Sequence, residues 1–486
     1  MTIKPLLGVS MAAAIAAVPL AGCQTLAPDY VRPAMASAAA WPTGPSYARL
    51  PGRTPPAAAA DIGWADFFTD ARLRKLIAIA LENNRDLRVA ALDIAKARAT
   101  FQAQNAQLLP TINLSGSATL ERQPSTTGPG NVVTRSGSIG VGISSFEIDF
   151  FGRLQSLSQQ ELENYLASEE AHRTSYLTLV SEVANAYTTL ASDKDHLSLS
   201  QSTLKSQQDS LELTQRSVNA GTSTDLAVAQ QRSSVETARG DIASYTAQIA
   251  QDINALTLYL GTSVPPDLLP NSLASIGEPR RIPVGLPSDV LLRRPDILEA
   301  EHTLKGANAN IGAARAAFFP SITLTSNAGT SQALARLFKA GSGAWVFSPN
   351  LNLPIFDGGQ NLANLRSSEA DRDIDIAQYE KAIQSGFKEV ADALAVHGTM
   401  AARMSAQTAL VAAYQRDYDL SMTRFRDGID SYLSVLQSQQ SLYTAQQNLI
   451  TLKASRMTNI ATLYKVLGGG WAPSAPRPVA MASGAR

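Results

Sequence analysis

The chain contains two copies of one unit, and this duplication constrains its fold more than any other feature. Residues of the first half recur 207 positions later: Glu182-Val183-Ala184 as Glu389-Val390-Ala391, and Leu256, Leu260 and Gly261 as Leu463, Leu467 and Gly468. Upstream the offset is 210: Ala103, Pro110, Ile112 and Leu114 recur as Ala313, Pro320, Ile322 and Leu324. Constant offsets of this kind mark an internal repeat. We predict a first repeat over 61–261, a linker over 262–287 and a second repeat over 288–468.

Each repeat is expected to begin with a helical stretch, 66–108 in the first and 288–318 in the second. Both stretches are followed by a proline, Pro110 or Pro320, a residue at which helices tend to end. Apolar and polar residues then alternate strictly, as in a β-strand with one apolar and one polar face.

In the first repeat this alternation covers 111–120, a loop is expected over 123–137, and a second alternation covers 139–150. Its phase changes at Ser144-Ser145, which indicates a β-bulge. The second repeat alternates at Ile322 and Leu324 and again from Trp345 to Ile355. The sequence therefore predicts two β-strands in each repeat.

A very long proline-free stretch follows each strand pair, because no proline lies between Pro129 and Pro265 or between Pro354 and Pro473. Apolar residues there recur in steps of four and three, the spacing of a helix with a narrow packing seam. As one helix, residues 153–219 would be about 100 Å long at 1.5 Å per residue.

Each long stretch is expected to turn back at a glycine, Gly221 or Gly428, into a second long helix. Thr224-Asp225 and Asp430-Ser431 are the expected caps of the two return helices.

The N-terminus has the pattern of a secretory signal. Lys4 precedes a short apolar run that ends in Leu20-Ala21-Gly22-Cys23, and Cys23 is the only cysteine. The tetrapeptide resembles a bacterial lipoprotein cleavage box, which implies cleavage before Cys23 and its acylation. We therefore predict a signal peptide at 1–22, a lipidated extended segment at 23–60, and anchoring to outer-membrane lipids. A flexible tail is expected at 469–486.

Four strands cannot close a membrane barrel, whose smallest examples have eight. An open edge in lipid would leave backbone groups without partners, so the strands must pair with other copies. Two copies would give a filled lumen and three an opening. The alternative is that the alternating segments belong to a soluble β-sandwich.

Charge and motifs exclude several classes of function. The numbers of basic and acidic residues are equal, 41 each, so the chain has no excess of positive charge with which to bind nucleic acid. No phosphate-binding, dinucleotide, nucleophile-elbow or zinc-protease motif is present, and the four histidines are not paired as metal ligands. His172 and His302 are interpreted as packing or surface residues, and Asp371, Asp373 and Asp375 as a solvated helix face. We expect no enzyme, no cofactor and no metal.

The residues carry a specific resemblance to the outer membrane factors of tripartite efflux systems. These form the TolC-like family, and the likeness is to its lipoprotein branch of the OprM and NodT type. The similar segments are Cys23 to Pro33, Trp64 to Phe68, Leu81 to Leu87, Phe146-Glu-Ile-Asp-Phe-Phe-Gly-Arg153, Pro354-Ile-Phe-Asp-Gly-Gly359, Arg424-Phe-Arg-Asp-Gly428 and Leu467-Gly-Gly-Gly-Trp471.

The resemblance implies an α+β membrane protein in which each repeat gives two transmembrane β-strands and a long periplasmic helical hairpin. A homotrimer would form a twelve-stranded β-barrel on an α-helical barrel in the outer membrane of a Gram-negative bacterium. The protein would be the exit duct of an efflux pump, conducting drugs or other small toxic compounds passively. Its partners would be a periplasmic adaptor and an inner-membrane pump of the RND type.

The resemblance also assigns roles to residues at the hairpin turns. Gly221, Thr222, Ser223, Gly428 and Ile429 would contact the adaptor, although the glycines could simply be helix caps. Leu433 and Gln437 would form a periplasmic constriction. Relatives often carry Asp at the second position, so an acidic ring is not predicted there, and Asp430 or Asp225 could supply charge instead. Arg424 would latch the closed state by pairing with Asp427 or Asp430.

Three other interpretations compete with the efflux duct. The same channel could serve an ATP-driven exporter. A lipid-anchored helical scaffold without a pore would leave the strand alternation unexplained. A periplasmic hydrolase has no residues in its favour.

Overall fold

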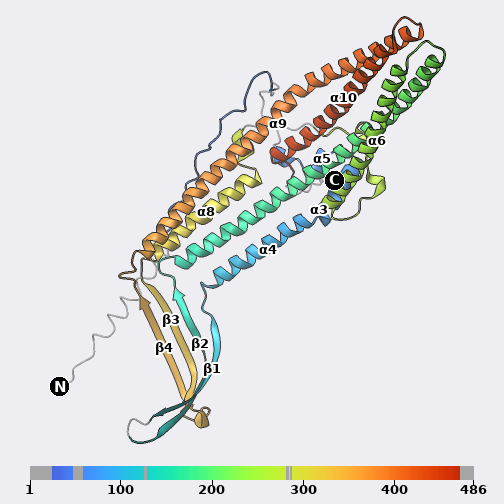
Figure 1. Ribbon diagram of the computed structural model, residues 1–486. Coiled ribbons are helices and arrows are strands. Elements are labelled where there is room, and N and C mark those ends of the chain that lie inside the picture. The colour runs from blue at the N-terminus through green and yellow to red at the C-terminus, as the bar shows by residue number, and fades with distance from the viewer. Residues whose placement is uncertain (1–24, 48–58, 125–127, 281–283, 285–286, 471–486) are drawn as a thin grey trace, which may run out of the picture. The chain divides into compact units, whose positions relative to one another are not determined.

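The same order of elements occurs twice in the computed structural model, which describes residues 25–47, 59–124, 128–280, 284 and 287–470 (Figure 1). The first copy comprises η1 (Ala59–Asp61), α2 (Trp64–Phe67), α3 (Ala71–Asn83), α4 (Arg85–Ala106), β1 (Ile112–Pro124), β2 (Asn131–Ile148), α5 (Arg153–Asn219) and α6 (Asp225–Leu260). After η2 (Pro266–Leu268) and η3 (Leu273–Ser275), the second comprises α7 (Pro287–Leu291), α8 (Pro295–Ala316), β3 (Ser321–Ala333), η4 (Leu334–Arg336), β4 (Gly343–Asn352), α9 (Gln360–Arg426) and α10 (Tyr432–Val466). The α+β fold with two repeats is as predicted.

Packing divides the chain into two units that cut across the repeats. Unit 1 consists of Met1–Ala34, Asp93–Ser168 and Glu299–Tyr379, and contains the sheet with the adjoining parts of four helices. Unit 2 consists of Met35–Leu92, Glu169–Leu298 and Glu380–Arg486, and contains the helical hairpins. Among the described residues, none of the helices combines the length and apolar character that crossing a membrane requires.

The sheet of unit 1 has four antiparallel strands in the order β1-β2-β3-β4. Its register places most of the apolar residues of the four strands on one face. Residues of this apolar face include Ile112 and Leu114 in β1, Val141, Ile143, Phe146 and Ile148 in β2, Ile322 and Leu324 in β3, and Trp345, Phe347 and Leu351 in β4. The other face carries mainly Asn, Ser and Thr, together with Val132 and Val346. The predicted bulge is confirmed, because the β2–β3 register shifts between Ile143 and Phe146 and Ser145 has a φ of 53°.

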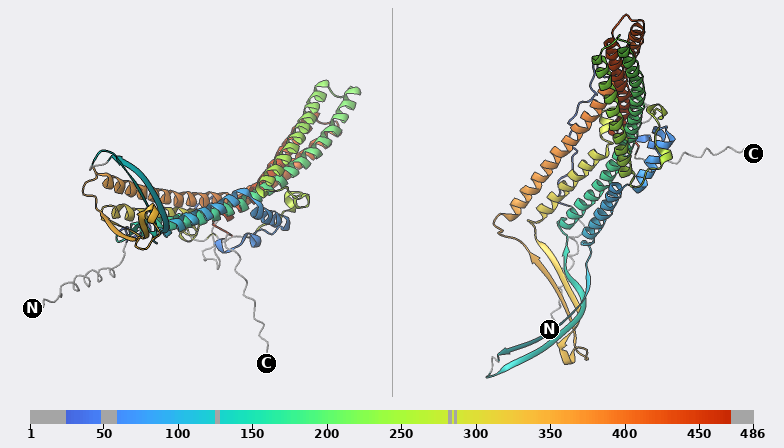
Figure 2. Two further views of the ribbon diagram at one scale, coloured as in Figure 1. Left: turned by 90° about the horizontal axis from the view of Figure 1, so that it is seen from below. Right: turned by 45° about the vertical axis from the view of Figure 1, so that its right-hand side comes forward.

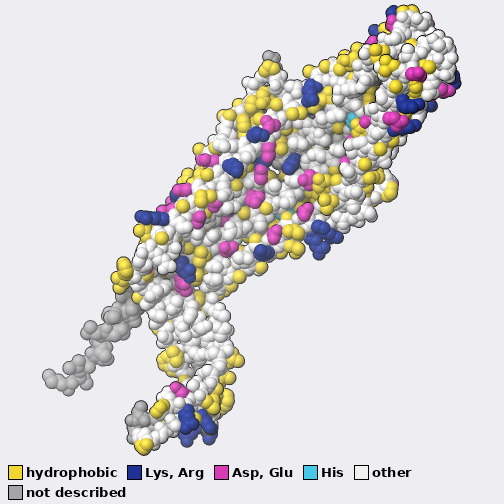
Figure 3. Space-filling view, viewed as in Figure 1, with side chains coloured by type: hydrophobic (Ala, Val, Ile, Leu, Met, Phe, Trp, Pro, Cys, Tyr) yellow, Lys and Arg dark blue, Asp and Glu magenta, His cyan; other side chains and the backbone are white. Residues whose placement is uncertain are grey.

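Glycines allow polar side chains to cross the other face of the sheet. The Asn327 side chain of β3 passes over Gly140 in β2 and donates from Nδ2 to Ser115 Oγ of β1, 3.1 Å away. A Cβ added at Gly140 would lie 2.0 Å from Asn327 Oδ1, so a larger residue would displace this bridge between non-adjacent strands. Figure 3 shows that Lys and Arg side chains gather at the free end of the sheet.

Aspartates cap the helices that follow each strand pair, which explains the two junction motifs. Asp149 accepts from the backbone N–H groups of Arg153 and Gln155, at 2.7 and 2.9 Å. Asp357 accepts likewise from Gly359 and Asn361, at 2.9 and 2.8 Å. These hydrogen bonds satisfy N–H groups that the first helical turn leaves unpaired.

Unit 2 is built from long hairpins, α5 with α6 and α9 with α10, whose two arms run side by side in Figure 1 and in the right-hand view of Figure 2. Its larger core brings together α2, α3, α5, α6 and α10, with the Phe67 ring stacked on Tyr464 at 4.2 Å between ring centroids. In a smaller core, Trp41 packs with Phe387 and Val390.

Four sequence-based boundaries were wrong, two in helical stretches and two at the strands. The stretch 66–108 is interrupted where Asp70 caps α3 and Asn84 accepts from Leu87 N at 2.8 Å. The stretch 288–318 is interrupted before Pro295, which begins α8 because its missing N–H costs nothing at a first helical position.

The loop expected over 123–137 is mostly strand, since β1 continues to Pro124 and β2 begins at Asn131. The ladder pairs small polar residues there, such as Thr119 with Ser136, whose sequence pattern resembles a loop. Conversely, β4 ends at Asn352, before Pro354 and short of the expected Ile355.

Candidate functional site at the hairpin turns

The two hairpin turns have the same backbone structure. Gly221 and Gly428 have φ values of +75° and +72°, a region that favours glycine. The N–H of each glycine donates to the carbonyl three residues before it, and the next residue, Thr222 or Ile429, donates to the carbonyl five residues before it. This pair of hydrogen bonds is the Schellman arrangement that ends a helix. A Cβ on either glycine would meet nothing within 4 Å, so it is φ, not space, that requires glycine.

The turns expose a mixed polar and apolar surface. Ile429 is 61% exposed, and Gly221, Thr222 and Gly428 are exposed as well, while Ser223 is half-buried. The predicted cap of the first return helix is confirmed, because the Thr224 hydroxyl accepts from Ala227 N at 3.4 Å. The adaptor contact itself stays a prediction.

Arg424 forms its ion pair with Asp430 and not with Asp427. Its Nε and Nη2 donate to the two carboxylate oxygens of Asp430 at 2.5 and 3.1 Å. The hydrogen bond from Arg424 holds the pKa of Asp430 below its ordinary value and raises the pKa of Arg424. The Asp430 carboxylate is therefore bound to Arg424 instead of capping α10. Ser431, the N-cap residue of α10, makes no side-chain cap hydrogen bond. The cap predicted at Asp430-Ser431 was therefore wrong in its side-chain contact.

Leu433 and Gln437 lie one turn apart on the exposed face of α10. The opposite face is packed, with Tyr432, Val435 and Gln439 buried. The rings of Tyr432 and Phe425 pack in a T-shaped arrangement with their centroids 5.1 Å apart. Burial raises the pKa of Tyr432 to about 12. Packing of Tyr432 thus orients Leu433 and Gln437 away from the protomer, where a constriction would need them.

A second polar group in unit 2 was missed by sequence reasoning. The carboxyl groups of Asp193 in α5 and Asp252 in α6 interact electrostatically, and Asp193 also interacts with the buried His196. Burial, together with the charge of Asp193, raises the pKa of Asp252 to about 7. Burial also lowers the pKa of His196. Its ring stacks on that of Tyr245, with the ring centroids 4.9 Å apart. No spacing in the sequence links Asp193 to Asp252, because only hairpin packing brings them together.

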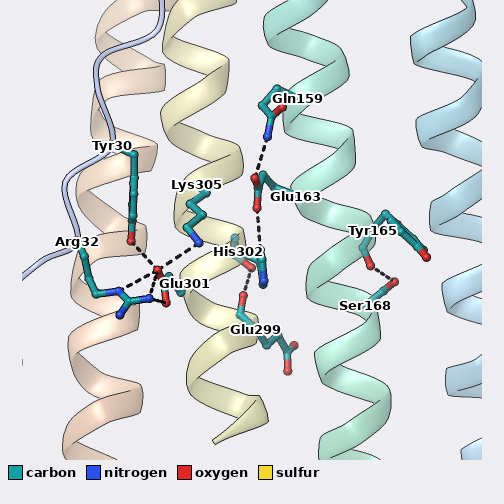
Figure 4. Close-up of polar contacts among 11 residues, drawn as sticks. Tyr30, Arg32, Gln159, Glu163, Tyr165, Ser168, Glu299, Glu301, His302 and Lys305 are labelled. Carbon is teal, nitrogen blue, oxygen red and sulfur yellow. Dashed lines mark hydrogen bonds and ion pairs between the residues drawn. The ribbon is translucent and has the colours of Figure 1, made fainter. Parts of the chain in front are cut away.

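Unit 1 contains a third group, in which Tyr30, Arg32 and Lys305 converge on Glu301 (Figure 4). Arg32 Nη2 lies 2.8 Å from both carboxylate oxygens of Glu301, whose side chain is 2% exposed. Burial acts to raise the pKa of Glu301, but the hydrogen bond from Arg32 and the nearby Lys305 outweigh it and lower the pKa. These contacts fasten the extended segment after Cys23 to α8.

His302 pairs with Glu163 at 2.7 Å, which agrees with a packing role rather than a ligand role. Within the described ranges, no cluster of three or more His, Cys, Asp and Glu side chains could hold a metal ion. Cys23 and the signal peptide lie outside the described residues, as does the tail from 471.

A sheet with one exposed apolar face, together with long helical hairpins that end in exposed turns, favours an outer-membrane channel protein. The family model described as "Outer membrane efflux protein" matches residues 76–262 and 286–469. The chain belongs to this family.

Characterised relatives agree with this membership. The chain is 47% identical to the antibiotic efflux pump outer membrane protein ArpC of Pseudomonas putida, over 94% of this chain and 95% of that protein. It is equally similar, with the same coverage, to the toluene efflux pump outer membrane protein TtgC of Pseudomonas putida. The crystal structure of the open state of the Neisseria gonorrhoeae MtrE outer membrane channel superposes with a TM-score of 0.82 at 36% identity, covering 92% of this chain and 98% of that one.

The protein is therefore the outer-membrane channel component of an efflux pump, located in the Gram-negative outer membrane with a large periplasmic part. Its relatives are channel proteins and not enzymes.

The raised pKa of Asp252 predicts a pH-dependent stability. The folded protein binds this proton more tightly than the unfolded chain, so the free energy of unfolding should fall as pH rises from about 4 to about 7. Asp252→Asn removes the charge and keeps a hydrogen-bond donor toward Asp193. We expect it to raise the thermal unfolding midpoint by a few degrees at pH 8 and to change it little at pH 5.

The measurement is thermal unfolding of the purified protein at both pH values. Asp209→Asn, at an exposed position of α5, is the matched control for loss of one carboxylate. An equal effect of Asp252→Asn at pH 5 and pH 8 would contradict the assignment.

Proposed function

We propose that three copies of this chain form the pore, and that it is the passive exit duct of a tripartite efflux pump. The observation that carries the proposal is the sheet: β1 and β4 are both terminal strands, and their outer edges run antiparallel to each other. β4 of one copy can therefore continue the ladder onto β1 of the next. Three copies give twelve strands, enough for an open lumen, whereas two give a filled barrel.

The exposed apolar residues fit this arrangement. Leu114, Trp345 and Phe347, on the apolar face, are 73%, 78% and 60% exposed in the protomer. In a closed barrel this face would lie against lipid, and the Asn, Ser and Thr residues of the other face would line the lumen. Burial of each large apolar side chain contributes about 1.5–3 kcal/mol.

The conducted compounds are proposed to be drugs or other small toxic compounds. Two relatives that are equally similar to this chain are named for different cargo, antibiotics in one case and toluene in the other. Cargo choice therefore lies with the pump, because a wide water-filled duct needs few specific contacts. The pump is proposed to be of the RND type, and the channel is proposed to be fixed to lipid through acylated Cys23.

Acylation is tested by mass spectrometry of the purified mature protein. The N-terminal peptide should begin at Cys23 and carry the mass of acyl chains, and Cys23→Ser should lose that mass. An unmodified Cys23 in protein purified from outer membranes would refute the lipid anchor.

The Arg424–Asp430 pair is proposed to hold the turn of the second hairpin in a closed arrangement. Arg424→Ala should increase the single-channel conductance of the purified protein in planar bilayers by about twofold or more. Asp430→Asn should do the same, and the double variant should add little, because both changes remove one interaction.

Arg426→Ala, two residues away and exposed, is the control for loss of a nearby cation. Exposed ion pairs contribute little to stability, so none of these variants should unfold the hairpin. A conductance that Arg424→Ala leaves unchanged would rule out the latch.

Docking is tested by photo-crosslinking from Ile429 in living cells, followed by identification of the captured protein. We expect capture of a periplasmic adaptor. The same photoreactive residue at Lys381, exposed on α9 within unit 2 and far along the helix from the turn, should capture less of it. Correctly localised protein that captures nothing from Ile429 would show that this turn is not the docking surface.

A further inference from the structure

The charged residues of the sheet are distributed very unevenly. The two strand hairpins, 112–148 and 321–352, contain six charged residues: Glu121, Arg122, Arg135, Glu147, Arg336 and Lys339. All four cations belong to the free end of the sheet, where β1 ends, β2 begins and η4 follows β3. We call Arg122, Arg135, Arg336 and Lys339 the basic rim. All four are exposed, and Figure 3 shows dark blue side chains gathered at this end.

Two of the rim cations lie on the apolar face of the sheet. Arg135 is directly opposite Leu120, and Arg122 is directly opposite Val133. By the alternation of strands, these positions share the face of Leu114 and Val141. Neither Glu121 nor Glu147 is on this face, because they pair with Thr134 and Thr323 in the other phase. The apolar face therefore ends in cations with no carboxylate among the described strand residues beside them.

The η4 turn adds apolar and basic groups to the same face. A Cβ at Gly137, two residues from Arg135 and in the same phase, would lie 2.8 Å from Leu334 Cδ2 and 3.6 Å from Leu337 Cδ2. These leucines thus cover the apolar face next to Arg135. The same turn carries Arg336 and Lys339, with Phe338 77% exposed between them.

The position of the rim along the strands matches a membrane boundary. From Ile148, at the helix-proximal end of the apolar face, to Arg135 is about 40 Å of strand at roughly 3.4 Å per residue. At the tilt of about 40° found in membrane barrels this is roughly 30 Å of height, slightly more than an apolar band of about 25 Å. Arg135 would then stand where hydrocarbon gives way to headgroups on the outer side.

We propose that the basic rim binds the phosphate groups of lipopolysaccharide in the outer leaflet. Leu120, Leu334 and Phe338 would lie against its acyl chains. Guanidinium groups bind phosphate in a bidentate manner, and a cluster of cations without nearby carboxylates complements a lipid that carries several phosphates. This inference rests on the proposed function, because it requires the strands to span the outer membrane.

The test uses the purified full-length protein in nanodiscs and bisphosphorylated lipid A as the probe, with bound lipid measured by native mass spectrometry. We expect Arg122→Gln/Arg135→Gln to weaken binding about tenfold or more. Lipid A without phosphates should bind the wild-type protein as weakly as the intact lipid binds the double variant. Lys96→Gln/Arg98→Gln, exposed on α4, removes the same charge elsewhere and should leave binding unchanged.

If the strand variant fails to fold, Arg336→Gln/Lys339→Gln in the exposed η4 turn replaces it, with a several-fold loss expected. Equal affinity of the wild-type protein and the rim variants would overturn the inference. Equal affinity for phosphate-free lipid A, or for phosphatidylglycerol, would overturn the assignment to lipopolysaccharide. Conductance of the wild-type protein is recorded in parallel. Pores with unchanged lipid affinity in the variants would refute only the rim, whereas absence of pores would refute the proposed function.

Discussion

The strongest constraint on this protomer lies at the two outer edges of the four-stranded sheet, where backbone N–H and C=O groups of β1 and β4 need hydrogen-bond partners. β1 and β4 each pair with a neighbour on one side within the chain. In water an open edge invites association, and in lipid each group without a partner costs several kcal/mol. Among the described residues no second apolar layer covers the sheet, since large side chains such as Leu114 and Trp345 stay exposed. The proposed closure with further copies inside a membrane would remove both deficits at once.

The helical hairpins follow from a different balance. Small and polar residues dominate α5, α6, α9 and α10, and many of their buried positions are serine, threonine or glutamine, such as Thr214, Gln231 and Ser438. Narrow seams of this kind allow helices to pack side by side without a thick core. Specific polar contacts then fix the register, as where Tyr443 Oη donates to Asp241 at 2.8 Å.

Periodicity in the sequence was sufficient for the type and order of most elements and for the long helix of the first repeat, which spans Arg153–Asn219 as expected. Alternation also located the bulge. It failed where side chains act locally: Asp70 and Asn84 interrupt a pattern that looks continuous. At the hairpin turns, resemblance supplied the residues, but only packing decided that Arg424 meets Asp430. The carboxyl pair of Asp193 and Asp252 had no sequence signal at all, because the two residues belong to opposite arms of a hairpin.

The two repeats show how duplication preserves geometry while chemistry diverges. Asn84 and Arg294 occupy equivalent positions 210 residues apart, and they donate to equivalent carbonyls, Tyr259 O at 2.9 Å and Val466 O at 2.8 Å. The same joint between a helix start and a helix end therefore exists twice in unit 2.

In the second repeat Arg294 also pairs with Asp296 and Glu389, at 2.6 and 2.7 Å, although it is 8% exposed. In the first repeat the equivalent carboxylate, Glu182, has no arginine partner within the part of the chain that the structure describes, and burial raises its pKa despite the charge of Lys465. Asp296 and Glu389 are 36% and 48% exposed, so solvent screens them in part, but separating the buried Arg294 cation from both still costs more than losing a neutral hydrogen bond. The second joint is consequently the more costly of the two to open, so a symmetric architecture contains an unequal distribution of stability between its hairpins.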